Sequence, residues 1–165
     1  GTNLAISAGV TTTANGVVTV NESGTLVVAA AGDIAADGAV SLTAAGGIST
    51  AGDITTTNDN VTFASATNLT GPVSIDTGAG IGNIVFQSTV DGAQALSLTA
   101  GAGNISFADT VGSVSPLQSL TINSADNVTF QATVSTVNGF VPPMKRPRPK
   151  SGVNEVIVPS RCNSS

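Results

Sequence analysis

The second half of the chain contains one four-residue phrase, Asn-x-x-Phe, four times. Its copies begin at Asn60, Asn83, Asn104 and Asn127, so they return at offsets of 23, 21 and 23 residues (60 to 83, 83 to 104, 104 to 127). In three of the four copies Thr-Val follows three residues after the phenylalanine. A fixed period in this range indicates stacked structural units rather than a globule built around a single active site.

The first half of the chain repeats as well, with a shorter unit that is richer in alanine. The phrase Ala-Gly-Asp-Ile begins at Ala31 and again at Ala51, an offset of 20 residues (31 to 51). Before it, residues 4–6 and 17–20 are short alternating stretches separated by Asn15-Gly16, which are strand and turn signals. The sequence therefore predicts one repeat domain over residues 1–140.

Small side chains dominate this domain and restrict its core. The chain is 41% apolar but only 3% aromatic and 9% charged, so a core must be thin and built from β-branched residues in register, which suits strands. Alternation points the second and fourth residues of each phrase inward. The predicted core stack is Phe63, Phe86, Phe107 and Phe130, with Val90, Val111 and Val134. A third inward set is Val73, Ile75, Leu96, Leu98, Leu120 and Ile122.

Three short strands in each unit of about 20 to 23 residues predict an all-β fold, a parallel β-helix of about six coils. Glycine-rich corners at residues 78–82 and 101–103 are expected to supply positive φ angles for the bends. The asparagine of each phrase is expected either to bond to its own backbone or to form a ladder with the asparagine of the next coil. Both end coils of such a solenoid need a cap.

Charge is divided unevenly along the chain. All five Lys and Arg residues follow Phe140, whereas residues 1–140 hold nine of the ten acids, so the body carries about -9 and the remainder +4 (five cations and one acid). An acidic body without cations makes nucleic acid a poor partner, since phosphate binding depends on Lys and Arg. No apolar run reaches the roughly 18 to 20 residues of a membrane span, so none is predicted.

The composition of the body also argues against catalysis. Enzymes built on parallel β-helices use an Arg or Lys base, or clustered carboxylates, on one face. Residues 1–140 contain no Lys, Arg, His or Tyr, and their acids fall mostly at expected turns, spaced near the repeat length. Ser is abundant, but no general base is evident nearby in sequence. The sequence therefore predicts a protein that is not an enzyme, with no catalytic residues and no cofactor.

Two further kinds of site are weaker alternatives. Oxygen ligands for calcium stand together at Asn58, Asp59 and Asn60, and at Asn123, Asp126 and Asn127. The dense Gly-Asp spacing of calcium-binding repeats is absent, so no metal site is predicted. Ice binding would use outward threonine columns. The candidates are Thr89, Thr110 and Thr133, and Thr62, Ser106 and Thr129 interrupted by Val85. Threonine columns also simply favour strands.

A proline-rich basic tail follows the repeat domain over residues 141–165. Four prolines in the ten residues 141–150 preclude a helix, and residues 153–158 then form one more expected strand before Pro159. This strand is predicted either to cover the last coil or to pair with a neighbouring subunit, unless the tail is a segment foreign to the repeat. The candidate assembly residues are Val153, Val156, Val158 and the single cysteine, Cys162.

The repeats resemble those of a known group of proteins. Residues 82–107 look like the repeats of very large bacterial surface proteins of the filamentous-haemagglutinin and autotransporter-adhesin type, and residues 40–54 are similar to their shorter repeats. The resemblance covers roughly residues 25–137 and implies a right-handed parallel β-helix, export to the cell surface and a role in adhesion or matrix. It carries over no binding residue, because no binding motif matches these positions.

Together, these features predict a non-enzymatic extracellular β-solenoid, structural or adhesive, of a bacterial surface protein. A self-assembling filament or matrix subunit is the alternative, and it would polymerise by end-to-end coil stacking or by exchange of the tail strand. The expected partners are other copies or neighbouring repeats, with cell-surface or polysaccharide ligands as further candidates.

Overall fold

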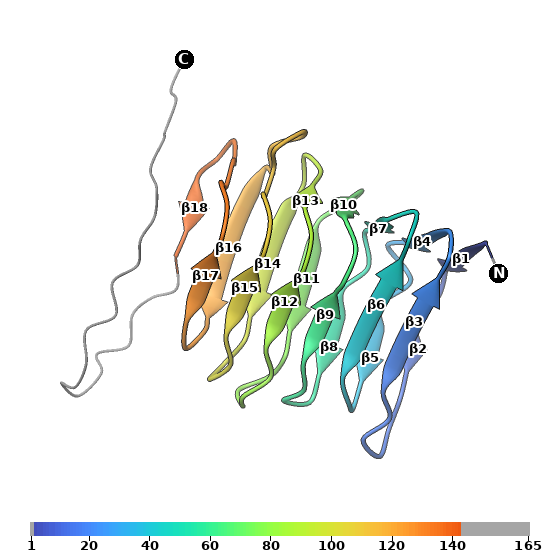
Figure 1. Ribbon diagram of the computed structural model, residues 1–165. Coiled ribbons are helices and arrows are strands. Elements are labelled where there is room, and N and C mark those ends of the chain that lie inside the picture. Colours follow the sequence, from blue (N-terminus) through green and yellow to red (C-terminus); the bar gives the residue numbers. More distant parts are fainter. Residues whose placement is uncertain (1, 143–165) are drawn as a thin grey trace.

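The computed structural model describes residues 2–142, and in this range it is entirely β-structure (Figure 1). Nowhere in this range is there a helix that could cross a membrane. Sheet A contains β1 (Asn3–Ile6), β4 (Thr25–Val28), β7 (Ile48–Thr50), β10 (Thr67–Leu69) and β13 (Val90–Asp91). Sheet B contains β2 (Val10–Thr11), β5 (Ile34–Ala36), β8 (Ile54–Thr56), β11 (Val73–Asp76), β14 (Ala95–Thr99), β16 (Ser119–Ser124) and β18 (Phe140–Val141). Sheet C contains β3 (Val18–Glu22), β6 (Val40–Ala44), β9 (Val61–Phe63), β12 (Ile84–Phe86), β15 (Ile105–Phe107) and β17 (Val128–Phe130).

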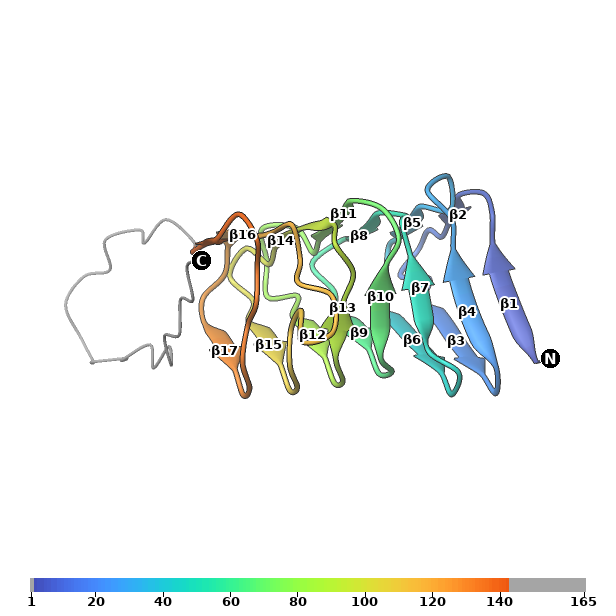
Figure 2. The ribbon, with the colours of Figure 1, turned by 90° about the horizontal axis from the view of Figure 1, so that it is seen from above.

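The chain visits sheets A, B and C in turn, once in each coil. Strands of the interior coils pair in parallel with strands of the neighbouring coils, so the coils stack along one axis into a β-solenoid of about six coils. Figure 2 shows this row of coils from above, with the N-terminus at one end of the stack. The predicted parallel β-helix with three short strands per coil is confirmed.

The sequence period sets the register of the sheets. In sheet C, Val61 pairs with Ile84, which in turn pairs with Ile105. In sheet B, Ile34 pairs with Ile54, so the two Ala-Gly-Asp-Ile phrases of the first half also lie one above the other. Equivalent positions of successive repeats therefore lie one above the other, and their inward side chains form columns along the rod.

The phenylalanines of the repeated phrase form one face-to-face stack inside the solenoid. Phe63, Phe86, Phe107 and Phe130 have successive ring-centroid distances of 4.9, 4.9 and 5.0 Å. The first three side chains are buried, whereas Phe130 in the last coil is half-buried. Phe140 of β18 closes the stack edge-on, with its centroid 5.6 Å from that of Phe130 and an interplanar angle of 89°.

The valine column of the predicted core follows the same pattern. Val90, Val111 and Val134 are joined by parallel bridges that continue sheet A beyond β13. Val90 and Val111 are buried, but Val134 is only partly buried because it belongs to the last described coil. Burial therefore falls at the C-terminal end of the stack.

Threonine occupies four inward positions that the apolar pattern did not reveal. Thr50, Thr56, Thr67 and Thr77 are buried, and each hydroxyl donates to a backbone carbonyl. The hydroxyl of Thr77, for example, lies 2.7 Å from the carbonyl oxygen of Gly82. Among the described residues no buried side-chain polar atom lacks a partner, so hydrogen bonds offset the cost of desolvating these hydroxyls.

Glycine serves the corners in two different ways. Gly78 and Gly101 have positive φ angles of 79° and 55°, as expected for the bends. Gly103 does not have a positive φ, but a Cβ there would lie 2.0 Å from the carbonyl oxygen of Gly82 in the adjacent coil. Gly103 is therefore required because neighbouring coils approach too closely there for a Cβ atom.

The phenylalanine stack predicts a large loss of stability when one interior ring is removed. Phe86→Ala should lower the free energy of unfolding by about 3–5 kcal/mol, because it leaves a cavity and removes two ring contacts. Val85→Ala is the matched control, since Val85 points outward from the same strand, and it should cost about 1 kcal/mol or less. Urea unfolding monitored by circular dichroism measures both changes, and equal costs would contradict the inward assignment.

Candidate functional site

The asparagines of the repeated phrase form a ladder along one corner of the solenoid. The side-chain Oδ1 of Asn60 accepts the backbone N–H and the Nδ2 of Asn83, at 2.8 and 3.1 Å. Asn83 Oδ1 accepts the same two groups of Asn104, at 2.8 and 3.2 Å. Asn127 continues the ladder through its Nδ2, which lies 3.0 Å from Asn104 Oδ1. Of the two expected arrangements, the structure shows the ladder.

Two of the oxygens that were candidate calcium ligands, those of Asn58 and Asn60, accept hydrogen bonds from the next coil. Asn58 Oδ1 accepts the backbone N–H of Gly80 at 2.6 Å, and Asn60 Oδ1 belongs to the ladder. Asn123 donates to the hydroxyls of Ser97 and Thr99, at 3.0 and 3.1 Å. Over residues 2–142 there is no group of three or more His, Cys, Asp or Glu side chains that could hold a metal ion.

Several acids of the body also connect one coil to the next. Asp33 Oδ1 accepts the backbone N–H of Asp53 at 2.8 Å, and Asp53 Oδ1 accepts that of Ser74 at 2.7 Å. Asp91 Oδ1 accepts two amides of the following coil, those of Val114 and Ser115, at 2.8 and 3.2 Å. These carboxylates act as hydrogen-bond acceptors for backbone that would otherwise face only solvent. The sequence predicts such acids at turns but does not predict these contacts, although the repetition of Asp33 and Asp53 within one phrase is a signal for them.

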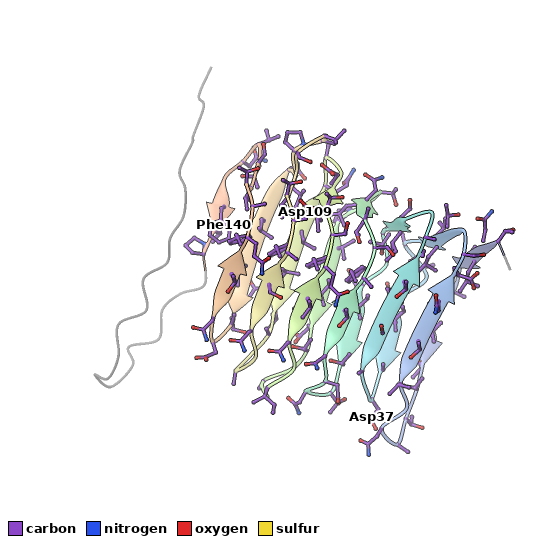
Figure 3. The ribbon with its side chains drawn as sticks, viewed as in Figure 1. Asp37, Asp109 and Phe140 are labelled. Carbon is purple, nitrogen blue, oxygen red and sulfur yellow. The ribbon has the colours of Figure 1, made fainter. Side chains whose placement is uncertain are left out.

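The acids of the described body lie at more than one corner of the solenoid. Figure 3 shows Asp37 and Asp109 in different coils and at different corners. Asp37 accepts the backbone N–H of Asn15 at 2.8 Å, and Asp109 accepts that of Thr110 at 2.7 Å. Each of these two carboxylates therefore accepts a backbone amide at its own corner.

The outward columns proposed for ice binding are in register but mixed in chemistry. Thr62 pairs with Val85, Val85 with Ser106, and Ser106 with Thr129. A single valine therefore interrupts the hydroxyl column. In the other column, the hydroxyl of Thr110 bonds to that of Ser113 at 3.0 Å.

A broad, open depression on the outer side of sheet B was not anticipated from the sequence. It is lined by Thr11, Thr13, Ala35, Asp37, Thr55 and Thr57. Thr11 pairs with Ala35 and Ala35 with Thr55, so a coil with a small side chain lies between two threonine-bearing coils. The threonine triplets at residues 11–13 and 55–57 are the sequence signal for this surface.

The last described coil combines apolar exposure with open strand edges. Val128, Phe130 and Val134 are only partly buried, and Val137 and Val141 are 70% and 53% exposed. We call this set the C-terminal coil surface. The candidate assembly residues Val153, Val156, Val158 and Cys162 lie outside the described residues.

Comparison of the chain with protein-family models, with curated proteins and with solved structures finds no match. The resemblance to bacterial surface adhesins therefore remains a prediction from the repeats.

The ladder predicts that one asparagine stabilises two coil junctions. Asn83→Ala removes the acceptor of the Asn104 amide and the donor to Asn60, so we expect a loss of about 1–2 kcal/mol in the free energy of unfolding. Gln87→Ala, an exposed position in the same coil, should change it by about 0.5 kcal/mol or less. Urea unfolding compares the two variants, and an equal effect would show that the ladder adds no stability.

The acid chain gives a test that separates structural from chemical roles. Asp53→Asn keeps an oxygen to accept the Ser74 amide, so stability should change by about 0.5 kcal/mol or less, whereas Asp53→Ala should cost about 1 kcal/mol. Thermal unfolding of both variants measures this difference. Equal destabilisation by the two substitutions would show that the charge, rather than the acceptor, is what the fold needs.

Proposed function

We propose that this chain is a non-enzymatic structural or adhesive rod of a bacterial surface protein, located outside the cell. The observation that supports this most is the use of polar side chains along the stack. The asparagine ladder and the acids Asp33, Asp53 and Asp91 are committed to backbone groups of neighbouring coils. Residues of this kind maintain a regular rod.

The charge of the body supports the same proposal. Residues 2–142 contain nine acids and no Lys, Arg or His, so they offer neither a cationic base nor an imidazole for general acid–base catalysis. An acidic, charge-poor rod instead suits a spacer or an adhesive stalk that keeps other surfaces apart. Its ligands would be cell-surface groups or polysaccharides, met by outward columns or by the depression on sheet B.

The alternative is a filament or matrix subunit, and one specific feature favours it. The C-terminal coil surface exposes apolar side chains beside strand edges that no strand of residues 2–142 covers, and such edges are templates for joining another chain. A head-to-tail contact between unlike ends does not close and gives fibres. Deletion of residues 141–165 tests the contribution of the tail to such assembly.

Electron microscopy with sedimentation velocity at micromolar concentration tests the proposal. We expect single rods of uniform length that sediment as monomers, because adjacent coils within each chain already satisfy one another. Fibres many chains long would favour the filament instead. Compact round particles would contradict both functions. Incubation with a panel of polysaccharides should release no new reducing ends or unsaturated products, and turnover that Asp53→Asn abolishes would identify an enzyme.

A further inference from the structure

Sheet C is one level shorter than the other two sheets in the described part of the chain. Sheet B has seven strands, and sheet A has five strands continued by the bridges at Val111 and Val134, which also makes seven levels (5 + 2). Sheet C has six strands and ends at β17. At the C-terminal end of the described rod, sheets A and B therefore extend one level beyond sheet C, and β17 is the last strand of sheet C.

The edge of β17 retains the pairing groups of an interior strand. In the interior, the first amide of β9, β12 and β15 donates to the carbonyl of the residue preceding the next strand: Val61 to Asn83, Ile84 to Asn104 and Ile105 to Asn127, at 2.8, 2.9 and 2.9 Å. The corresponding N–H of Val128 has no acceptor within residues 2–142, and neither the carbonyl of Phe130 nor the Oδ1 of Asn127 receives a donor there. Half-buried Val128 and Phe130 add an incomplete apolar surface to this edge.

We propose that residues 156–158 of the chain's own tail pair in parallel with β17 and form the seventh level of sheet C. This goes beyond the proposed function, because it assigns an occupant to the C-terminal end of the rod. Chain order supports it, since every coil proceeds from sheet A to sheet B and then to sheet C. The last described strand, β18, belongs to sheet B, so a strand that follows it in the same order would lie on sheet C.

The sequence of the tail fixes the register. The run Val153-Asn-Glu-Val-Ile-Val158 is the β-prone stretch beyond residue 142. With Val156 over Val128 and Val158 over Phe130, both valines continue inward columns and Ile157 continues the outward column of Thr129. A shift by one residue would turn Glu155 toward the core, where an unpaired charge is costly.

The connection is long enough and carries complementary charge. Between sheets B and C the connections in the described coils contain three to seven residues, for example 37–39 and 77–83. Residues 142–155 number fourteen, which is long enough for a connection to β17. They include Lys145, Arg146, Arg148 and Lys150. Three acids, Asp37, Asp59 and Asp126, lie at this same corner in earlier coils.

A second copy fits this edge less well. Sheets A, B and C of a second copy begin with β1, β2 and β3. If β1 and β2 of that copy paired with the last levels of sheets A and B, its β3 would lie two levels from β17. One level of sheet C would then remain empty. The tail is also held near β17 by its own chain, which raises its effective concentration to about the millimolar range. At micromolar protein, pairing within one chain therefore prevails over pairing between chains.

A disulfide experiment in the full chain tests the register and the occupant together. In a Cys162→Ser background, the pair Thr129→Cys and Ile157→Cys should form a disulfide within one chain, because neighbouring parallel strands lie about 4.8 Å apart. The matched control pairs Ser106→Cys with Ile157→Cys. Ser106 lies one level further away, so this pair should cross-link at least about tenfold less. Non-reducing electrophoresis and peptide mapping after mild oxidation measure the products.

Disulfide-linked dimers would overturn the proposal in favour of exchange between copies, and equal or absent cross-linking in both pairs would overturn it altogether. Hydrogen exchange of the unmodified chain gives a second readout that needs no cysteine. Peptides covering residues 128–130 should exchange as slowly as those covering 105–107. Val156→Asp with Val158→Asp should remove this protection at least about tenfold, while Ile157→Asp should retain it. Fast exchange at residues 128–130 in the unmodified chain would also overturn the proposal.

Discussion

Every coil of this solenoid depends on in-register parallel pairing with the coils on either side. A coil contributes three strands of two to six residues, which are too short to be stable without neighbours. Pairing places each inward side chain over an equivalent one, so the ring stack of Phe63, Phe86 and Phe107 and the aliphatic columns beside it form one continuous core. Stability is then a sum of contacts between adjacent coils, as expected of a quasi-one-dimensional protein.

The same pairing explains how a body with nine acids and no cations forms a regular rod. At the corners, backbone amides leave the sheets and need acceptors, and the carboxylates of Asp33, Asp53 and Asp91 supply them from the adjacent coil. The side chains of Asn60 and Asn83 also accept backbone amides of the next coil, and the side chains of Asn60, Asn83 and Asn104 bond to one another. An asparagine ladder adds no charge as it lengthens, so it tolerates repetition at a spacing where a carboxylate ladder would repel itself.

The fold was predictable because the period of the sequence and the register of the sheets express the same constraint. Offsets of 21 to 23 residues between phrases become the pairing of Val61 with Ile84 and Ile105. The buried threonines were not predictable, because the core position of Thr77 depends on a hydrogen bond to Gly82 that only the folded corner creates. The carboxylate contacts between coils were missed for a similar reason, since turn position alone does not show which amide a carboxylate will reach. The depression on sheet B depends on Ala35 lying between Thr11 and Thr55, and therefore on register rather than on any local motif.

These constraints also determine which positions can be substituted without disturbing the stack. Inward columns must keep their volume, and the asparagine ladder must keep both its donor and its acceptor, so neither tolerates much variation. Outward positions are different: Val85 stands between Thr62 and Ser106 in one column without disturbing the pairing of either neighbour. A ligand-binding surface can therefore change along these columns while the stack beneath it stays the same. The Asn-x-x-Phe phrase then specifies the rod, and under the proposed function the specificity for a partner would lie in residues outside that phrase.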